Sequence, residues 1–185
     1  SKSLMIVDMP HNTYRTKSEA LKNCKKVMKE TKCDGVKLEG GKKIKNIIEH
    51  LGKNKIPVLG HLGILPQSVR GKFKSKGKSL RERNQLMRDA KILENTGVFA
   101  IVLECVESSL SKTITKEIKI PTIGIGSSNN CDGQILVTDD ILGLTDSKIK
   151  FVKKFVDVKK LIAEGAKKFN AEVKSKKYPS KKYSY

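Results

Sequence analysis

Residues 36–41, VKLEGG, show a pattern that recurs along the chain: a short, mostly apolar run that ends in a charged side chain. These runs are rich in β-branched residues, which favours buried strands. The strands predicted on this basis are residues 4–7, 36–38, 56–59, 99–103, 122–125 and 134–137. Helical spacing predicts helices at residues 18–29, 42–51, 80–95, 109–117 and 158–173. The alternation of strands and helices predicts an α/β fold in which helices cover a parallel sheet.

Proline and glycine residues mark the expected ends of these elements. Pro57 and Pro121 each stand at the start of a predicted strand, where a missing N–H is tolerated. Gly35 and Gly97 stand just after predicted helices, where a left-handed cap residue is common. No sharp change in composition divides the chain, so we expect one barrel domain over residues 1–173 and a polar, partly disordered tail over residues 174–185.

Charged or titratable side chains stand at the carboxyl ends of four predicted strands. They are Asp8, Glu39, His61 and Glu104. In a (β/α)8 barrel the catalytic residues collect at this end of the strands, so the pattern predicts an active site there. The six predicted strands are two fewer than a complete barrel needs, and the chain has 185 residues where such a barrel typically has about 250.

The chain is strongly basic, with 39 Lys and Arg against 19 Asp and Glu and a formal net charge of +20. This charge is compatible with nucleic-acid binding, which would depend steeply on salt. The lysines, however, are spread over every segment, arginine is scarce and aromatic residues make up 5% of the chain. The composition therefore favours a solvated, lysine-rich surface over a nucleic-acid partner.

The cysteines and the hydropathy bear on the compartment. Cys24, Cys33, Cys105 and Cys131 form no CxxC pair and no metal-finger spacing, which disfavours a disulfide framework and a zinc module. No apolar stretch is long enough to span a bilayer, and the first residues show no signal-peptide pattern. We therefore expect a cytoplasmic protein with no membrane partner.

Two glycine-rich stretches resemble nucleotide-binding motifs but depart from their spacing. Residues 71–79, GKFKSKGKS, have five residues between the glycines where a P-loop has four, and no strand is predicted before them. Residues 124–133, GIGSSNNCDG, have Asn129 in place of the third glycine of GxGxxG. The sequence therefore argues against a nucleotide site of either kind.

Seven motifs are similar, in order, to the ketopantoate hydroxymethyltransferase family. They are VDMPHNTY from Val7, VKLEGG from Val36, GHLGILPQS from Gly60, VLECV from Val102, IPTIGIG from Ile120, CDGQILV from Cys131 and KFVKKF from Lys150. The resemblance implies a TIM (β/α)8 barrel of the phosphoenolpyruvate/pyruvate-domain type. About six of its eight βα units are expected here, because the family's N-terminal portion with its first two strands has no counterpart in these motifs. The resemblance also implies a homo-oligomer, since the family forms decamers.

The resemblance further implies a reaction and a set of site residues. The family transfers a hydroxymethyl group from 5,10-methylenetetrahydrofolate to 3-methyl-2-oxobutanoate, which gives 2-dehydropantoate for pantothenate biosynthesis through a Mg²⁺-stabilised enolate. The 2-oxo acid and the folate are thus the implied small-molecule partners. Asp8 and Glu39 match two of the family's Mg²⁺ ligands, Asp8, Lys37 and His61 match substrate-binding positions, and Glu104 matches the proton acceptor. A third family carboxylate lies in the portion without a counterpart here.

The residues themselves leave other interpretations open. Lys37 could alternate outward from its strand, Glu104 could cap a helix, and His61 could be a buried histidine bonded to backbone. For the whole chain, one alternative is an inactive or partner-dependent truncated remnant that acts as a binding or structural subunit. The retained Asp8, Lys37, Glu39 and Glu104 argue against that remnant. A related Mg²⁺-dependent 2-oxo acid lyase is disfavoured because no KKCGH-like segment is present.

Overall fold

The computed structural model describes residues 3–68 and 74–185. Its first compact unit, which extends to Ile135, contains a six-stranded sheet in which every neighbouring pair is parallel. The strands are β1 (Ile6–Asp8), β2 (Gly35–Glu39), β3 (Val58–Gly63), β4 (Ala100–Glu104), β5 (Thr122–Ile125) and β6 (Gly133–Gln134). Their spatial order follows the chain, as in a section of a barrel, whereas a doubly wound sheet reverses its order at a switch point. The predicted α/β class is confirmed.

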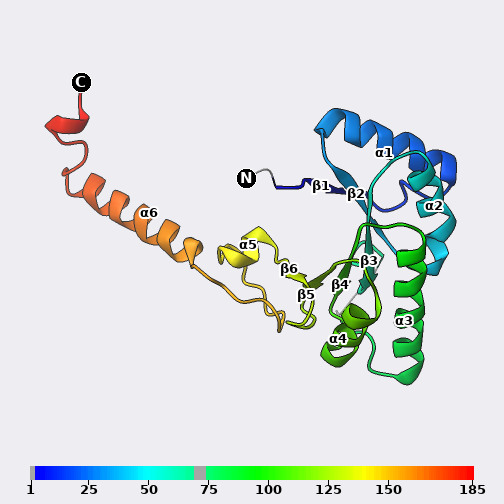
Figure 1. Cartoon of the computed structure of the whole chain (residues 1–185). Helices are drawn as coiled ribbons and strands as arrows, with labels where there is room; N and C mark the ends of the chain where they lie inside the picture. Colours follow the sequence, from blue (N-terminus) through cyan, green and yellow to red (C-terminus); the bar gives the residue numbers. More distant parts are fainter. Residues whose placement is uncertain (1–2, 69–73) are drawn as a thin grey trace. The chain divides into compact units, whose positions relative to one another are not determined.

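Helices connect the strands and lie along one side of the sheet (Figure 1). They are α1 (Lys17–Thr31), the 3-10 helix η1 (Lys42–Ile44), α2 (Lys45–Lys53), α3 (Leu80–Asn95) and α4 (Ser108–Glu117). Thr16 caps α1 by accepting a hydrogen bond from the backbone N–H of Glu19, and Ser79 caps α3 in the same way through Glu82, both at 3.2 Å. Hydroxyl caps of this kind satisfy N–H groups that the first helical turn leaves free.

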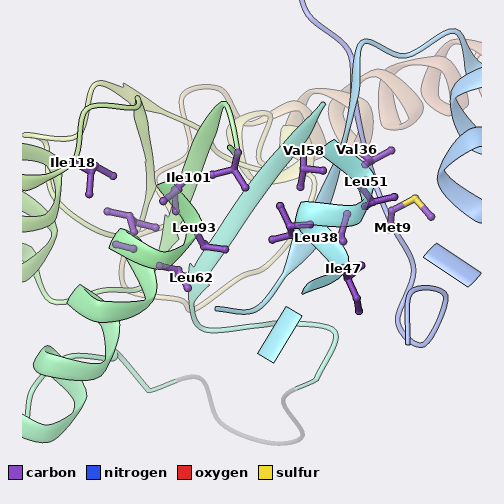
Figure 2. Close-up of a cluster of buried hydrophobic side chains, with 14 of the residues drawn as sticks. Met9, Val36, Leu38, Ile47, Leu51, Val58, Leu62, Leu93, Ile101 and Ile118 are labelled. Atoms are coloured by element: carbon purple, nitrogen blue, oxygen red, sulfur yellow. The ribbon is translucent and has the colours of Figure 1, made fainter. Parts of the chain in front are cut away.

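The main core lies between these helices and one face of the sheet (Figure 2). Val36, Leu38 and Ile101 from the strands are 0% exposed, as are Leu51 of α2 and Leu93 of α3. Burying one such aliphatic side chain contributes about 2 kcal/mol. The helices are therefore held to the sheet by an apolar layer that alternate strand residues supply.

The opposite face of the sheet carries the site. A smaller apolar cluster of Leu59, Ala100 and Val102 lies on this face. Along each strand these residues alternate with residues of the main core. Because side chains alternate along a strand, Lys37 and Glu39 share this inner face with Leu59 and His61. The strand register then places the site residues near one another. Asp8 pairs with Lys37, Glu39 pairs with His61, and Glu104 pairs with Gly63, two residues after His61.

Most predicted bounds lie within three residues of the observed ones, and the largest difference is at β3, which was predicted at residues 56–59 and spans Val58–Gly63. Helix α3 and strand β5 have the predicted bounds. Strand β1 begins two residues later than predicted, at Ile6, and β6 is limited to Gly133–Gln134. The prediction of a strand through residue 137 was wrong because Val137 is the N-cap of a short helix, α5 (Thr138–Ile141), whose first turn contains two aspartates that suit a helix start.

Of the two glycines predicted as helix caps, Gly97 has the predicted conformation and Gly35 does not. Gly97 has φ +84° just after α3, as predicted. Gly35 does not cap α1, because Lys32 takes the left-handed cap position with φ 59° and Gly35 already belongs to β2. A side chain at Gly35 would place its Cβ 3.0 Å from the carbonyl oxygen of Pro57, so glycine serves close packing between strands. Pro57 and Pro121 directly precede β3 and β5, as predicted.

Residues 136–185 form a second compact unit. It contains α5, the longer helix α6 (Val158–Lys174) and the 3-10 helix η2 (Lys181–Tyr183). Within this unit the ring of Tyr178 packs edge-on against Phe169 with 5.5 Å between centroids. The predicted division into a barrel domain at 1–173 and a tail at 174–185 stays a prediction.

Two further sequence predictions concern the loops and membranes. Of the P-loop-like stretch 71–79, residues 71–73 lie outside the described residues, while Ser79 serves as the α3 cap. Across residues 3–68 and 74–185, no helix combines the length and the apolar character needed to cross a bilayer.

We expect Gly63→Ala to destabilise the protein strongly. Gly63 has φ +102°, and an added Cβ would lie 2.1 Å from the backbone carbonyl oxygen of Glu104. The substitution therefore combines backbone strain with a clash that no side-chain rotation relieves, at a cost of about 3 kcal/mol or more. Urea unfolding followed by circular dichroism measures the change.

Gly97→Ala is the matched control for this substitution. Gly97 also has a positive φ, +84°, but an added Cβ would meet nothing within 4 Å. Gly97→Ala should lower the free energy of unfolding only through backbone strain, by about 1 kcal/mol. Equal losses for the two variants would show that the contact with Glu104 is unimportant.

Candidate active site

Lys37 lies at the centre of a cluster contributed by neighbouring strands. Its Nζ is 2.8 Å from Oδ2 of Asp8 on β1 and 3.2 Å from Nδ1 of His61 on β3. The Lys37 side chain is 19% exposed, so the ammonium group is largely removed from water and paired on both sides. The structure thus turns Lys37 toward the inner face and brings together three residues that the sequence predicted.

His61 connects this pair to Glu104. Its ring is 1% exposed, and Nε2 lies 2.9 Å from the backbone oxygen of Ile64 and 3.3 Å from Oε2 of Glu104. A lysine ammonium only donates, so Nδ1 accepts from Lys37, whereas the carbonyl of Ile64 only accepts, so Nε2 carries the hydrogen. The ring is therefore the neutral Nε2–H tautomer, by inference from its partners.

Glu39 is the second predicted metal ligand, and its carboxylate is buried. The residue is 6% exposed, and its Oε2 atom has no hydrogen-bond partner within the described part of the chain. Burial raises the pKa of the Glu39 carboxyl, and the nearby Lys37 ammonium opposes that rise. A buried carboxylate oxygen without a partner is costly unless a cation or proton satisfies it.

The residues present fit a Mg²⁺ ion on chemical grounds. Mg²⁺ prefers hard oxygen ligands and is commonly held by one or two carboxylates together with waters. Glu39 offers an unsatisfied oxygen, while one oxygen of Asp8 is engaged by Lys37. Within residues 3–68 and 74–185, no group of three or more His, Cys, Asp or Glu side chains gathers at one point to hold a metal. The fit therefore rests on two carboxylates.

Glu104 ends β4 and is followed by an unusual backbone conformation. Cys105 has φ +51°, a region that L residues rarely adopt. Ser127 spans this bend: its hydroxyl donates to the carbonyl of Leu103 at 2.7 Å and accepts from the N–H of Val106 at 3.1 Å. The N–H of Lys76 also donates to the Cys105 carbonyl at 2.8 Å. These contacts fix the direction in which Glu104 leaves the strand.

The cysteine beside Glu104 is not a nucleophile at neutral pH. Burial, together with the Glu104 carboxylate, raises the pKa of the Cys105 thiol to about 11. The thiolate is the reactive form, so Cys105 stays protonated and unreactive.

Several contributors to the site were not predicted from the sequence. The Tyr14 hydroxyl accepts a 3.4 Å hydrogen bond from the backbone N–H of Glu39, and burial raises the pKa of Tyr14. The backbone of Gln67 lowers the pKa of the Glu39 carboxyl, and the Oε1 atom of Gln67 is buried without a described partner. Both residues lie in the motifs VDMPHNTY and GHLGILPQS, which was the available signal. The substrate and metal roles of Asp8, Lys37, Glu39, His61 and Glu104 stay predictions.

The fold and this cluster together define a class of protein. Carboxylates, a paired lysine and a buried histidine lie at the carboxyl ends of successive parallel strands, which is the arrangement of active sites in barrel-type α/β enzymes. The chain belongs to the ketopantoate hydroxymethyltransferase family, whose sequence model matches residues 1–181.

Individual relatives agree with this assignment. The chain is 60% identical over 184 residues to a 3-methyl-2-oxobutanoate hydroxymethyltransferase from Pelagibacter ubique, a match that covers 100% of the chain and 71% of the relative. It is 43% identical to the enzyme of the same name from Chlorobaculum parvum, over 100% of the chain and 68% of that relative. The Aliarcobacter butzleri enzyme is also 43% identical, over 99% of the chain and 69% of the relative.

Glu107, three residues beyond Glu104, should stabilise the protein in a pH-dependent way. Its carboxylate caps α4 at Leu110, binds the hydroxyl of Ser109 and lies 2.9 Å from a guanidinium nitrogen of Arg83. The Ser109 contacts are the main reason that the pKa of Glu107 falls to about 2, with Arg83 and Leu110 adding to it. A lowered pKa stabilises the fold above the unfolded value, and this stabilisation is lost as pH falls toward 2.

We therefore expect Glu107→Gln to lower stability by about 1 kcal/mol at pH 7, the usual value of a cap, and by less at pH 3.5. Urea unfolding at the two pH values measures the difference. Glu30→Gln on α1, which removes an exposed 4.0 Å pair with Lys26, is the control and should change little at either pH. An equal loss at both pH values would contradict an electrostatic contribution from Glu107.

Proposed function

We propose that this chain transfers a hydroxymethyl group from 5,10-methylenetetrahydrofolate to 3-methyl-2-oxobutanoate, which gives 2-dehydropantoate in pantothenate biosynthesis. The observation that carries the proposal is the continuous chain of contacts from Asp8 through Lys37 and His61 to Glu104, with the unsatisfied Glu39 oxygen beside it. The names of the relatives, 3-methyl-2-oxobutanoate hydroxymethyltransferases, support the reaction. A complete TIM barrel of the phosphoenolpyruvate/pyruvate type, a homo-oligomer and a cytoplasmic location belong to the same proposal.

The first chemical step is the removal of a proton from the carbon next to the substrate carbonyl. Glu104 is the proposed base, since its side chain is 14% exposed at the end of an apolar strand and touches the buried ring of His61. The electron pair left on carbon moves onto the carbonyl oxygen, which gives the enolate. Lys37 supplies positive charge and an N–H donor for the oxygen that becomes negative.

In the second step the enolate carbon forms a carbon–carbon bond to the methylene unit that the folate carries. The methylene carbon is bonded to two folate nitrogens: one carbon–nitrogen bond breaks as the carbon–carbon bond forms, the other breaks as water supplies the hydroxyl oxygen, and each nitrogen keeps its electron pair. The two nitrogens take up the proton that Glu104 removed and one proton from the water. No protein nucleophile is required, which agrees with the protonated state of Cys105. Asp8 and Glu39 are the proposed Mg²⁺ ligands, and bound Mg²⁺ would add positive charge near the substrate oxygens.

We expect Glu104→Gln to abolish the first step while leaving the fold intact. The amide cannot accept the proton, so exchange of the substrate's C3 hydrogen with deuterated water should fall by about 100-fold or more. Proton NMR of 3-methyl-2-oxobutanoate in D2O with Mg²⁺ measures the exchange. Glu117→Gln, an exposed glutamate of α4, is the matched control. Unchanged exchange in Glu104→Gln would exclude Glu104 as the base.

Full turnover with methylenetetrahydrofolate tests the function as a whole. It should be measured with this chain alone and with the family's N-terminal portion added as a separate chain. Turnover that Glu104→Gln abolishes, in either arrangement, is the expected result. Absence of turnover and of exchange in both arrangements would overturn the proposed function and favour a binding or structural subunit.

Mg²⁺ binding should depend on Glu39 and on pH. Because burial raises the pKa of Glu39, protons compete with the metal at this carboxylate, and affinity should fall as pH is lowered. Glu39→Gln should weaken binding about tenfold or more and flatten the pH dependence. Isothermal titration calorimetry measures both effects. Glu49→Gln on α2, which loses only an exposed pair with Lys45, should bind like the unaltered chain. Equal affinity in Glu39→Gln would remove Glu39 from the ligand set.

A further inference from the structure

His61 is too deeply buried to offer a ligand much surface, yet both of its ring nitrogens are engaged. The residue is 1% exposed, with Lys37 at Nδ1 and with Ile64 and Glu104 at Nε2. Lys37 and Glu104 come from β2 and β4, and β3 lies between them. The histidine is thus the physical link between the lysine and the carboxylate.

We infer that His61 is a positioning residue that holds Lys37 and Glu104 at once, each through a different ring nitrogen. The effect of His61 on catalysis rests on the proposed function, whereas its contacts with Lys37 and Glu104 do not depend on any reaction. The tautomer that joins the two is Nε2–H, since Nδ1 must accept from the lysine ammonium.

On the lysine side, His61 limits the freedom of the ammonium group. Lys37 has three N–H donors, of which Asp8 takes one at 2.8 Å and His61 takes another at 3.2 Å. One donor remains for an oxygen of the substrate. Two fixed partners on a flexible four-carbon side chain preorganise that remaining donor, which lowers the entropy lost on binding.

On the carboxylate side, a short segment holds Glu104 in two places. The N–H of Ile64 donates to the backbone oxygen of Glu104 at 2.9 Å, while the carbonyl of Ile64 accepts from Nε2 of His61 at 2.9 Å. The same nitrogen lies 3.3 Å from the Glu104 side chain. The segment from His61 to Ile64 therefore bonds to the backbone of Glu104 and places the His61 ring against its carboxylate.

Two substitutions separate these roles because amide groups can replace one ring nitrogen at a time. In His61→Asn the Oδ1 atom can stand near the position of Nδ1 and accept from Lys37, but nothing reaches Glu104. In His61→Gln the Nε2 atom can stand near the position of the ring Nε2 and donate to Ile64 and Glu104, but the acceptor for Lys37 is lost. His50→Asn and His50→Gln on α2 are the matched controls.

Kinetics of deuterium exchange test the effect of His61 on catalysis. His61→Asn should keep KM within about threefold and lose about tenfold or more in kcat, because only the base is displaced. His61→Gln should raise KM about tenfold, because the lysine that meets the substrate is no longer held. Identical changes in the two variants, or unchanged kinetics in both, would overturn the division of roles.

The tautomer of His61 tests its contacts with Lys37 and Glu104 without any substrate. Long-range ¹H–¹⁵N NMR at pH 8 distinguishes the protonated from the unprotonated ring nitrogen, and the spectrum of His61→Asn assigns the His61 signals among the chain's 3 histidines. The expected result is an Nε2–H ring. An Nδ1–H ring, or a rapidly exchanging mixture, would overturn the inference even if the enzyme is active. An inactive chain with an Nε2–H ring would refute the proposed function and leave the geometric link intact.

Discussion

The ammonium group of Lys37 lies on the inner face of a parallel sheet, where an unpaired charge would be costly, and its neighbours are arranged to satisfy it. Asp8 on one adjacent strand and His61 on the other both reach its Nζ atom. Because these residues are in register, the pairing constrains β1, β2 and β3 relative to one another. A slip of one residue in β2 would turn Lys37 toward the apolar core under the helices. The same interaction therefore specifies the sheet and assembles the site.

The two candidate metal carboxylates have opposite electrostatic environments. The Asp8 side chain is 43% exposed and paired with the Lys37 ammonium, so water and the lysine both contact its carboxylate. Glu39 is buried with one oxygen unsatisfied, and burial raises its pKa. Without a cation this carboxylate opposes folding at neutral pH, because its charged form is poorly solvated. An ion bound there would remove that cost, so metal binding and folding stability are coupled at Glu39.

The sequence predicted the central strands and helices because their signals are local. Ser79 with Glu82 defines the start of α3, and a β-branched run after Pro121 defines β5. The left-handed cap at Lys32 was missed because nothing in a lysine favours positive φ, and Gly35 nearby was the stronger local candidate. The structure is compatible with both interpretations of His61, a buried ring bonded to backbone and a site residue. One ring nitrogen contacts the backbone of Ile64 and the other contacts Lys37.

The orientation of Glu104 could not be predicted from its own segment. The left-handed conformation of Cys105 costs roughly 1–3 kcal/mol, and it persists because contacts distant in sequence determine it. Ser127, Lys76 and Ile125 supply those contacts, through a hydroxyl, an N–H and a carbonyl. A motif such as VLECV identifies which residue carries the carboxylate, but the direction of that carboxylate depends on how the ends of β4 and β5 pack with the segment around Lys76. Substitutions at Ser127 are therefore expected to act on the site through Glu104, although Ser127 itself bonds only to backbone.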